Sequence, residues 1–300
     1  MTFNKKPKKF LTKSGFTFLE LALVLAVIGT IVGVVIAGQK LTDMAALNGA
    51  RSATVSSPVS VYDGLVLWLD TTSKKSFDEI EVKAGNTISN WYDINPKKND
   101  PINFTQTTTA NKPIYTPKAI GRLPALIFNQ NVMNSVNNIP LARIAAESGE
   151  VTIFVVGKSD MINGPRFTGF FFFYPSFLDR IGFDMDPTSI SWNSGTCCTG
   201  RITTDSSVYT NQWAIFTGVR KTDTTEMRID GASVGGSPTA IPIVEIDPTS
   251  KVQIALGTGS QTNKLSGGIA EIIVFNRGLS TTEVSGIETY LSQKWKIKLQ

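Results

Sequence analysis

The N-terminal part of the chain contains one long apolar run. Residues 16–38 read FTFLELALVLAVIGTIVGVVIAG and include a single ionisable side chain, Glu20. A helix of this length measures roughly 35 Å, which is enough to cross the hydrocarbon core of a bilayer. Apolar positions keep helical spacing beyond residue 38, so we expect one helix over residues 16–54 that ends ahead of Pro58.

From residue 64 onward, short apolar segments alternate with polar turns rich in Thr, Ser, Asn, Gly and Pro. This pattern is typical of β-strands, and no strand–helix alternation accompanies it. We therefore expect a linker over residues 55–63 and, over residues 64–300, an antiparallel two-sheet jelly-roll sandwich in a mainly β chain. The expected strands are Gly64–Asp70, Thr87–Asp93, Leu123–Asn129, Val151–Gly157, Thr168–Tyr174, Arg180–Asp184, Ile190–Asn193, Gln212–Val219, Thr225–Asp230, Lys251–Gly257 and Gly268–Asn276.

Two local signals shape the C-terminal part of the chain. Asp230-Gly231 follows an apolar segment and predicts a tight hairpin. Ser280-Thr-Thr-Glu283 has the spacing of a capping box, which predicts the start of a short C-terminal helix. Val284, Ile287 and Trp295 would lie on one face of that helix.

Positive charge is concentrated ahead of the apolar run. Residues 1–15 hold five of the 29 Lys and Arg residues and no acidic residue, which leaves 24 side chains of each sign in the rest of the chain. A basic flank stays in the cytoplasm, so we expect the C-terminal domain on the periplasmic side. The balanced remainder predicts no nucleic-acid partner. The lack of histidine excludes His-based triads and most zinc sites.

The junction between the basic segment and the apolar run reads Gly15-Phe16-Thr17-Phe18-Leu19-Glu20. It resembles the class III signal of type IV pilins and pseudopilins. The resemblance implies that a prepilin peptidase removes residues 1–15 by cutting after Gly15, and that the new N-terminal Phe16 is methylated. It also implies that Glu20 pairs with this amine on a neighbouring subunit. Alternatively, Glu20 is a helix-end carboxylate that reaches the membrane interface.

A second resemblance covers roughly residues 62–298. Gly64–Asp70, Trp91–Asp93, Leu123–Phe128 and the stretch Gly268–Glu283 look like landmarks of a laminin-G-like, concanavalin A-like lectin/glucanase domain. The resemblance implies a two-sheet jelly roll and the binding of glycans or of host or surface proteins. The chain departs from the family pattern at Asn95-Pro96-Lys97-Lys98, where Ser-Gly is usual, so the turn and whatever it binds differ.

Some enzymes of this fold are glycosidases, which need two carboxyl groups about 5 Å apart or more. The enzymes of the family that the chain resembles use a Glu-x-Asp-x-(x)-Glu run. Glu245-Ile246-Asp247 is followed by Pro248 and lacks the third acid of that run, and Asp184-Met185-Asp186 is also incomplete. Glu271 lies in an apolar strand, where we expect a buried structural acid or an inter-strand pair in place of a catalyst. We therefore expect no enzymatic activity.

Candidate ligand contacts lie near predicted turns. Trp192, Asn193 and Tyr209 combine aromatic faces with a planar amide, as sugar sites do, although these residues fit a core equally well. The aromatic run Gly169–Tyr174 would place alternate rings on opposite sheet faces, where they form either core or an exposed patch.

Three polar residues of one loop, Asp93, Asn99 and Asp100, offer oxygen atoms of the kind that calcium prefers, although a solvated turn is the simpler interpretation. We expect no other cofactor. The adjacent Cys197 and Cys198 either form a strained disulfide in an oxidising compartment or remain buried thiols.

Together these features predict a minor pilin or pseudopilin of a type IV pilus or a type II secretion-like filament. The chain would cross the inner membrane once and then join other subunits in a surface pilus or periplasmic filament, where it displays its lectin-like domain. The alternative is a membrane-tethered glycan-binding protein or glycosidase that does not polymerise.

Overall fold

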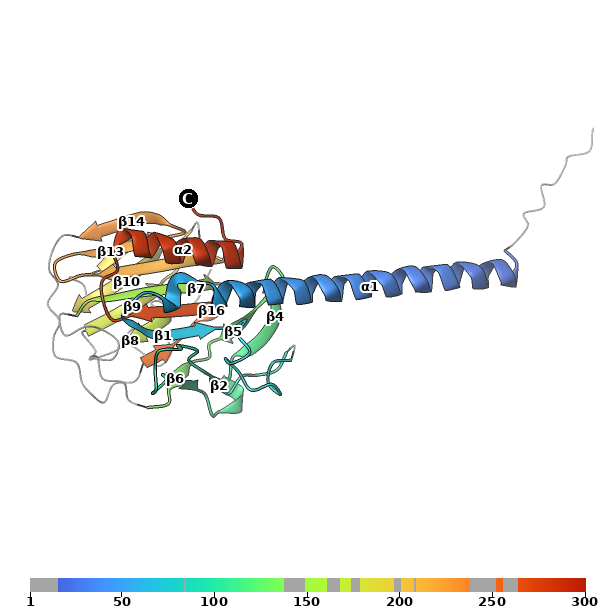
Figure 1. The fold of residues 1–300 in the computed structure, drawn as a ribbon, viewed down its shortest axis with the longest axis horizontal. Coiled ribbons are helices and arrows are strands. Elements are labelled where there is room, and N and C mark those ends of the chain that lie inside the picture. Colours follow the sequence, from blue (N-terminus) through green and yellow to red (C-terminus); the bar gives the residue numbers. More distant parts are fainter. Residues whose placement is uncertain are drawn as a thin grey trace, which may run out of the picture. The chain divides into compact units, whose positions relative to one another are not determined.

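The computed structural model describes residues 16–83, 85–137, 149–160, 168–173, 179–196, 201–207, 209–237, 252–255 and 264–300. The chain divides into two compact units, Met1–Ala45 and Ala46–Gln300. As predicted, it is mainly β, with a long N-terminal helix, two antiparallel sheets and a short C-terminal helix (Figure 1). Helix α1 (Phe18–Val55) begins in the first unit, and its last turns belong to the second.

Sheet A has eight strands, with the path β14-β13-β12-β7-β16-β5-β4 and β1 paired to β16. One edge of β16 pairs with β7, while the opposite edge pairs first with β5 and then with β1. This register sets Asp70 of β1 beside Glu271 of β16. The strands are β1 (Leu65–Asp70), β4 (Ile114–Ile120), β5 (Leu123–Asn129), β7 (Val151–Ser159), β12 (Ala214–Arg220), β13 (Thr225–Ile229), β14 (Ala232–Ser237) and β16 (Ser266–Phe275).

Sheet B also has eight strands, in the order β11-β10-β9-β8-β15-β6-β3-β2. Its neighbouring strands are all antiparallel. The strands are β2 (Asn90–Trp91), β3 (Phe104–Thr105), β6 (Met133–Ser135), β8 (Thr168–Phe173), β9 (Asp179–Met185), β10 (Ser189–Thr196), β11 (Arg201–Asp205) and β15 (Val252–Ile254).

Five strands were not predicted, namely β3, β4, β6, β11 and β14. Strands β4 and β14 form the two ends of the sheet A path, and β11 forms one end of sheet B. End strands tolerate proline, glycine and polar residues, such as Pro117 in β4 and the Gly235-Gly236 pair in β14. Strands β3 and β6 have only two and three residues, too few to show a period.

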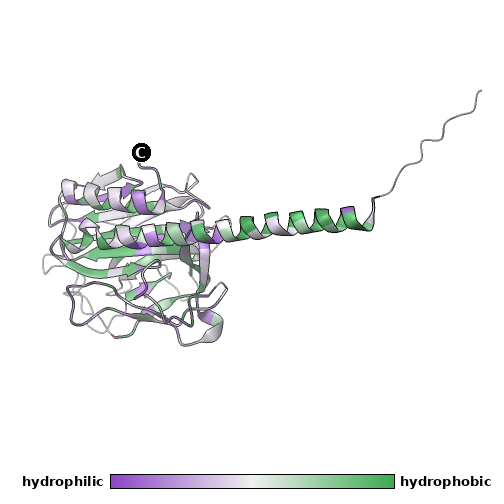
Figure 2. Cartoon of the chain, turned by 45° about the vertical axis from the view of Figure 1, so that its right-hand side comes forward, coloured by the Kyte–Doolittle hydropathy of each residue, from purple (hydrophilic) through white to green (hydrophobic). Residues whose placement is uncertain are grey.

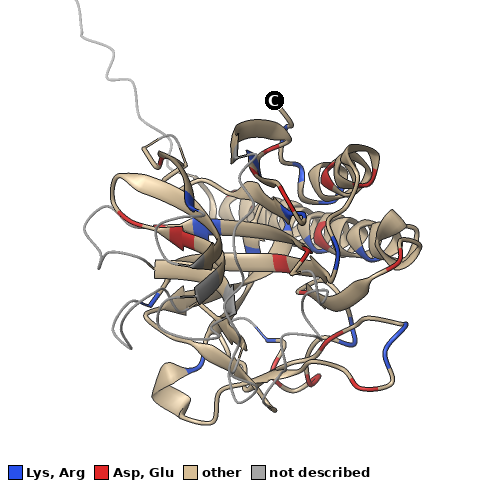
Figure 3. Cartoon of the chain, turned by 90° about the vertical axis from the view of Figure 1, so that its left-hand side faces the viewer, with Lys and Arg blue, Asp and Glu red and all other residues tan. Residues whose placement is uncertain are grey.

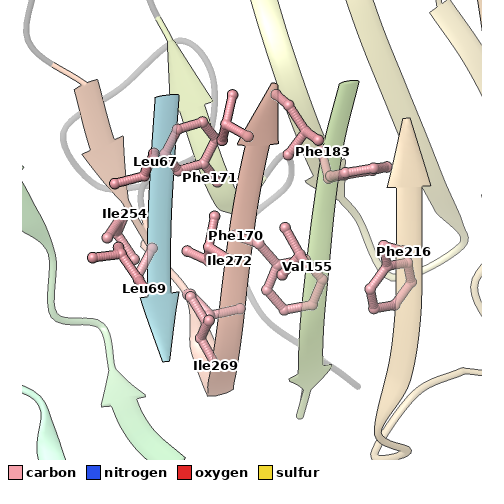
Figure 4. Close-up of a cluster of buried hydrophobic side chains, with 14 of the residues drawn as sticks. Leu67, Leu69, Val155, Phe170, Phe171, Phe183, Phe216, Ile254, Ile269 and Ile272 are labelled. Carbon is pink, nitrogen blue, oxygen red and sulfur yellow. The ribbon is translucent and has the colours of Figure 1, made fainter. Parts of the chain in front are cut away.

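The core between the sheets is built from large apolar side chains of both (Figure 4). The aromatic run of β8 contributes two fully buried rings, Phe170 and Phe171. The register of β8 against β9 is irregular between Gly169 and Phe172, so these two consecutive rings both join the core instead of facing opposite sides. The core interpretation is confirmed for these two residues, and Tyr174 lies outside the described residues.

A second cluster covers the outer face of sheet A. Helix α2 (Thr281–Trp295), the last turns of α1 and the 3-10 turn Pro58–Ser60 pack there around Phe154, Ile273 and Phe275. Val59 of the 3-10 turn is fully buried, so the segment expected as a linker contributes to packing. Charged residues of both signs are interspersed over the side of the domain shown in Figure 3.

Helix α2 begins as predicted, with both halves of the capping box present between Ser280 and Glu283. Arg277 donates hydrogen bonds to both carboxylate oxygens of Glu283. These bonds hold the pKa of Glu283 at about 2, well below its usual range. The predicted apolar face is buried, and two charged residues of the same helix, Glu288 and Lys294, are buried with it.

The hairpin predicted at Asp230-Gly231 joins β13 to β14. Both residues have positive φ values, 49° and 82°, as a type I′ turn requires. The carboxylate of Asp230 accepts a hydrogen bond of 2.7 Å from the backbone N–H of Ile215. Burial raises the pKa of Asp230 to about 6.

We expect Asp230→Asn to stabilise the protein near neutral pH by up to about 3 kcal/mol, because about two pKa units correspond to that free energy. The folded pKa lies above the unfolded one, so the folded protein holds the proton more tightly between about pH 4 and pH 6. Stability therefore falls as pH rises through this window, and Asn removes the loss. Urea unfolding of the detergent-solubilised chain and of the variant at several pH values measures the difference in their free energies of unfolding.

The matched control is Asp205→Asn, since the pKa of the exposed Asp205 is lowered by hydrogen bonds from Ser207. This control should gain nothing at neutral pH. An Asp230→Asn gain that is the same at pH 4 and at neutral pH would contradict a buried carboxylate as its cause.

Candidate functional sites

The first candidate site is the apolar stretch of α1. Its large apolar side chains from Phe16 to Ile36 are 46–88% exposed, and Figure 2 shows apolar residues along its length. Among the described residues, one helix is long and apolar enough to cross a membrane. A continuous apolar surface of this extent marks a region that lipid or protein covers.

Glu20 closes the first turn of this helix. Its Oε2 accepts hydrogen bonds of 2.8 Å from the backbone N–H and 2.9 Å from the hydroxyl of Thr17. The Thr17 hydroxyl in turn accepts a bond of 3.2 Å from the N–H of Glu20. Thr17 and Glu20 thus form a capping box, which sequence reasoning recognised at Ser280 but missed here, although the spacing is the same. The carboxylate is held at the helix start, close in the chain to Phe16.

The second feature is a buried ionic cluster beneath α2. Lys294 Nζ lies 2.8 Å from Asp70 Oδ2 and 2.8 Å from Glu271 Oε2, and all three side chains are fully buried. Trp68 and Tyr290 each donate a bond of 2.7 Å to Glu271 Oε1. Glu271 is therefore a buried, hydrogen-bonded acid, the first of the two predicted alternatives, and its ion pair is with Lys294 of helix α2 and not with another strand.

The remaining oxygens of the cluster also have donors. Trp295 Nε1 donates a bond of 2.7 Å to Glu271 Oε2. Thr54 at the end of α1 donates to Asp70 Oδ2 at 2.8 Å, and the Thr72 backbone N–H donates to Asp70 Oδ1 at 2.8 Å. Burial raises the pKa of Glu271, while the ammonium of Lys294 opposes this rise. No pattern in the sequence connects Lys294 with Glu271, because only the docking of α2 brings them together.

The third candidate site is an open cavity of about 420 Å³ in the second unit. Trp68 and Ile94 supply apolar surface, while Arg51, Lys74 and Lys75 supply positive charge. Arg51 is fixed by a hydrogen bond of 2.8 Å from its Nε to the carbonyl oxygen of Thr72. The full lining is Arg51, Thr54, Val55, Ser60, Trp68, Ser73, Lys74, Lys75, Ile94 and Pro96.

The chemistry of this lining favours an anionic ligand with an apolar face. The ten lining residues include three cations, three hydroxyl groups and no acidic side chain. Ligand sites of this size are mostly apolar with a few placed polar groups. Loop residues Ser73–Lys75, Ile94 and Pro96 contribute much of the lining, so the loop Asn95–Lys98 lies beside the cavity.

The predicted ligand contacts do not form a common site. Trp192 is fully buried, packs against Phe183 with ring centroids 4.9 Å apart and donates a bond of 2.8 Å to Thr225. Its ring thus serves the core, the alternative that the sequence left open. Asn193 is also buried. Tyr209 lines a cavity of about 10 Å³, which holds about one water and no sugar.

Of the three predicted oxygen ligands in the Asp93 loop, Asp93 binds the backbone. Asp93 accepts hydrogen bonds of 3.0–3.1 Å from the N–H groups of Trp68, Asn95 and Ile102. Burial raises its pKa, and these bonds oppose the rise. Asn99 and Asp100 are exposed. Among the described residues, no group of three or more His, Cys, Asp or Glu side chains is arranged to hold a metal ion.

Several predicted residues lie outside the described part of the chain. They are Gly15, Glu245, Asp247 and the Cys197–Cys198 pair.

Comparison with known families supports the second resemblance. The model of the concanavalin A-like lectin/glucanases superfamily matches residues 143–285, which run from before β7 into α2. A concanavalin A-like lectin/glucanase domain is therefore supported in this part of the chain. No curated protein matches the chain in sequence.

Solved structures share the fold at low identity. Trypanosoma rangeli sialidase is 16% identical, with a TM-score of 0.51, over 77% of this chain and 33% of the sialidase. The binding domain of Paraclostridial Mosquitocidal Protein 1 is 12% identical, with a TM-score of 0.52, over 75% of this chain and 52% of that one. The chain thus spans only part of each structure, and the similarity shows the fold alone.

The cavity should prefer acidic over neutral oligosaccharides. We expect Lys74→Glu with Lys75→Glu to weaken the binding of polygalacturonate fragments about tenfold, because two attractive charges become repulsive. Titration calorimetry of the full chain in detergent measures the dissociation constant, and added salt should weaken binding. The control Lys83→Glu reverses an exposed lysine that does not line the cavity. Equal binding of neutral maltooligosaccharides would argue against charge selection.

Proposed function

We propose that this chain is a minor pilin or pseudopilin that assembles through α1 into a type IV pilus or a type II secretion-like filament and displays a lectin-like domain. The observation that carries the proposal is the uncovered apolar stretch of α1 with Glu20 alone at its start. Before assembly, lipid of the inner membrane covers this stretch. In the filament, the same stretches of neighbouring subunits cover one another.

Glu20 supports assembly over simple anchoring. A carboxylate at the start of a membrane helix is costly unless it finds a partner. The capping box holds this carboxylate at the helix start through Thr17, next to the position where cutting after Gly15 would create an amine. A neighbour's Phe16 amine then offers an opposite charge in the assembled state alone, which fixes the register between helices.

The lectin-like domain has a binding role in this proposal. The concanavalin A-like fold and the basic, partly apolar cavity beside Trp68 support glycan recognition. Binding is favoured over hydrolysis because Glu271, a buried acid of sheet A, is engaged by Trp68, Tyr290, Lys294 and Trp295. The domain lies in the periplasm before assembly, and on the pilus surface or a periplasmic filament afterwards.

A second candidate is a membrane-tethered glycan-binding protein that does not polymerise. The capping box favours it, since Glu20 already has a role within its own helix. A tether needs the apolar length of α1 but needs no partner for the carboxylate.

We expect the protein from membranes or sheared filaments to begin at an N-methylated Phe16. The physical reason is that the peptidase removes the basic segment and keeps the apolar run for assembly. Intact mass and N-terminal sequencing give the result directly. A chain that retains Met1 would instead identify an ordinary signal anchor.

We expect Glu20→Ala to remove the subunit from sheared filaments while its membrane level stays unchanged, because the helix remains apolar but loses the charge that fixes its register. Immunoblotting of filament and membrane fractions measures both. Asp43→Ala, an acid on the same helix beyond the apolar run, is the matched control and should assemble normally. Normal filament levels of the Glu20→Ala protein would favour the tether.

A further inference from the structure

The buried cluster of Lys294, Asp70 and Glu271 places an amine between two carboxyl groups in a site closed to water. The amine nitrogen lies 2.8 Å from an oxygen of each carboxyl group, and the side chains have no exposed surface. Lys294 also donates a bond of 3.1 Å to Tyr290 and lies over the ring of Trp295, 4.9 Å from its centroid. The amine is thus fixed in position against both carboxyl groups.

We propose that Lys294 and Asp70 condense into an intramolecular isopeptide bond, with Glu271 relaying the protons. The inference concerns the domain itself and does not depend on the proposed function. Lys294 and Asp70 are joined, Glu271 is regenerated, and one water molecule is the by-product, so no further reactant is required.

The hydrogen bonds assign different roles to the two carboxyl groups. Glu271 accepts bonds from Trp68, Tyr290 and Trp295, which hold it in place as a proton acceptor beside the amine. The Oδ1 atom of Asp70 instead accepts two hydrogen bonds of 2.8 Å, one from the backbone N–H of Thr72 and one from its hydroxyl group. Those two donors stabilise the negative charge that forms on Oδ1 when an amine attacks the carboxyl carbon.

The reaction moves two protons from nitrogen to oxygen and releases one water molecule. Glu271 takes a proton from the Lys294 ammonium and delivers it to Oδ2 of Asp70. The neutral amine attacks Cγ of Asp70, and a C–N bond forms while negative charge collects on Oδ1. A second proton passes from the nitrogen through Glu271 to the hydroxyl group on Cγ. The C–O bond then breaks, water leaves, and Glu271 is a carboxylate again beside the new amide.

Burial supplies the conditions for this reaction. A fixed amine and carboxyl group react as one molecule, which removes most of the entropic barrier. Two buried charges become one neutral amide, which removes the cost of keeping them out of water. The Glu271 carboxylate that remains still accepts hydrogen bonds from Trp68, Tyr290 and Trp295. Burial also raises the pKa of Glu271, which helps it hold the proton in transit. The same closure protects the amide from hydrolysis.

The bond would join the beginning and the end of the domain. Asp70 ends β1, shortly after α1 enters the domain, and Lys294 lies in the last turn of α2. A covalent link between them encloses most of the sandwich in one loop. It thereby restricts the unfolded chain, as a long-range cross-link does.

We expect the folded full chain, extracted in detergent, to contain a branched tryptic peptide in which Ser52–Lys74 is joined to Gly278–Lys296. Trypsin would not cut after Lys294 once its side chain is an amide. The peptide mass should be lower than the sum of its parts by one water. Fragmentation should assign the bond to Asp70, and a bond to Glu271 would overturn the division of roles between the two carboxyl groups. Unlinked peptides from a folded chain would overturn the proposal.

The chain offers its own control. Lys158 Nζ and Asp160 Oδ1 are 2.7 Å apart but partly exposed to solvent, and their peptides should stay unlinked. Lys294→Arg keeps the charge and should lack the branched peptide. Glu271→Gln keeps the size of the relay but replaces one acceptor oxygen with an NH2 group that cannot take up the proton. It should leave Lys294 and Asp70 unlinked in a chain that circular dichroism shows to be folded. A linked Glu271→Gln chain would exclude Glu271 as the relay.

Discussion

The packing of the second unit depends on ion pairs and hydrogen bonds that compensate the buried charges beneath α2 in place of water. Lys294 has two carboxylate partners, Asp70 and Glu271, and all three side chains are closed to solvent. Nearer the start of α2, Glu288 accepts bonds from Arg228 and Thr217 in sheet A. A buried charge that loses its partner is strongly destabilising. Helix α2 therefore has one position on sheet A, and that position also holds β1 and, through Thr54, the end of α1.

The two units differ in whether their large apolar side chains are covered. The sandwich encloses most of its large apolar side chains between its sheets and beneath α2, whereas those of α1 before Ala37 remain exposed. The first arrangement is complete within one chain. The exposed apolar stretch of α1 requires lipid or further subunits to cover it. This difference is the physical basis for assigning an assembly role to α1 and a separate binding role to the domain.

Local signals in the sequence predicted local structure well. The capping box at Ser280 and the hairpin at Asp230-Gly231 involve neighbours in the chain, and both are present. The same rule applied to Thr17 would have found the contact of Glu20. Period-two reasoning failed at Phe170 and Phe171, because an irregularity in the pairing of β8 brings consecutive rings into one core. End strands were missed since burial does not impose a pattern on them.

Residues close together in the chain are enough to predict the fold class, the apolar helix, the capping signals and the resemblance to two families. The contacts of the side chains depend instead on the tertiary structure. In the folded chain Trp192 is buried, and the Asp93 carboxylate accepts hydrogen bonds from backbone N–H groups. A basic cavity forms beside Trp68, and Lys294 forms ion pairs with Asp70 and Glu271. These contacts join residues far apart in sequence, and the register of β1 on β16 and the docking of α2, which set them, leave no periodic signal in the chain.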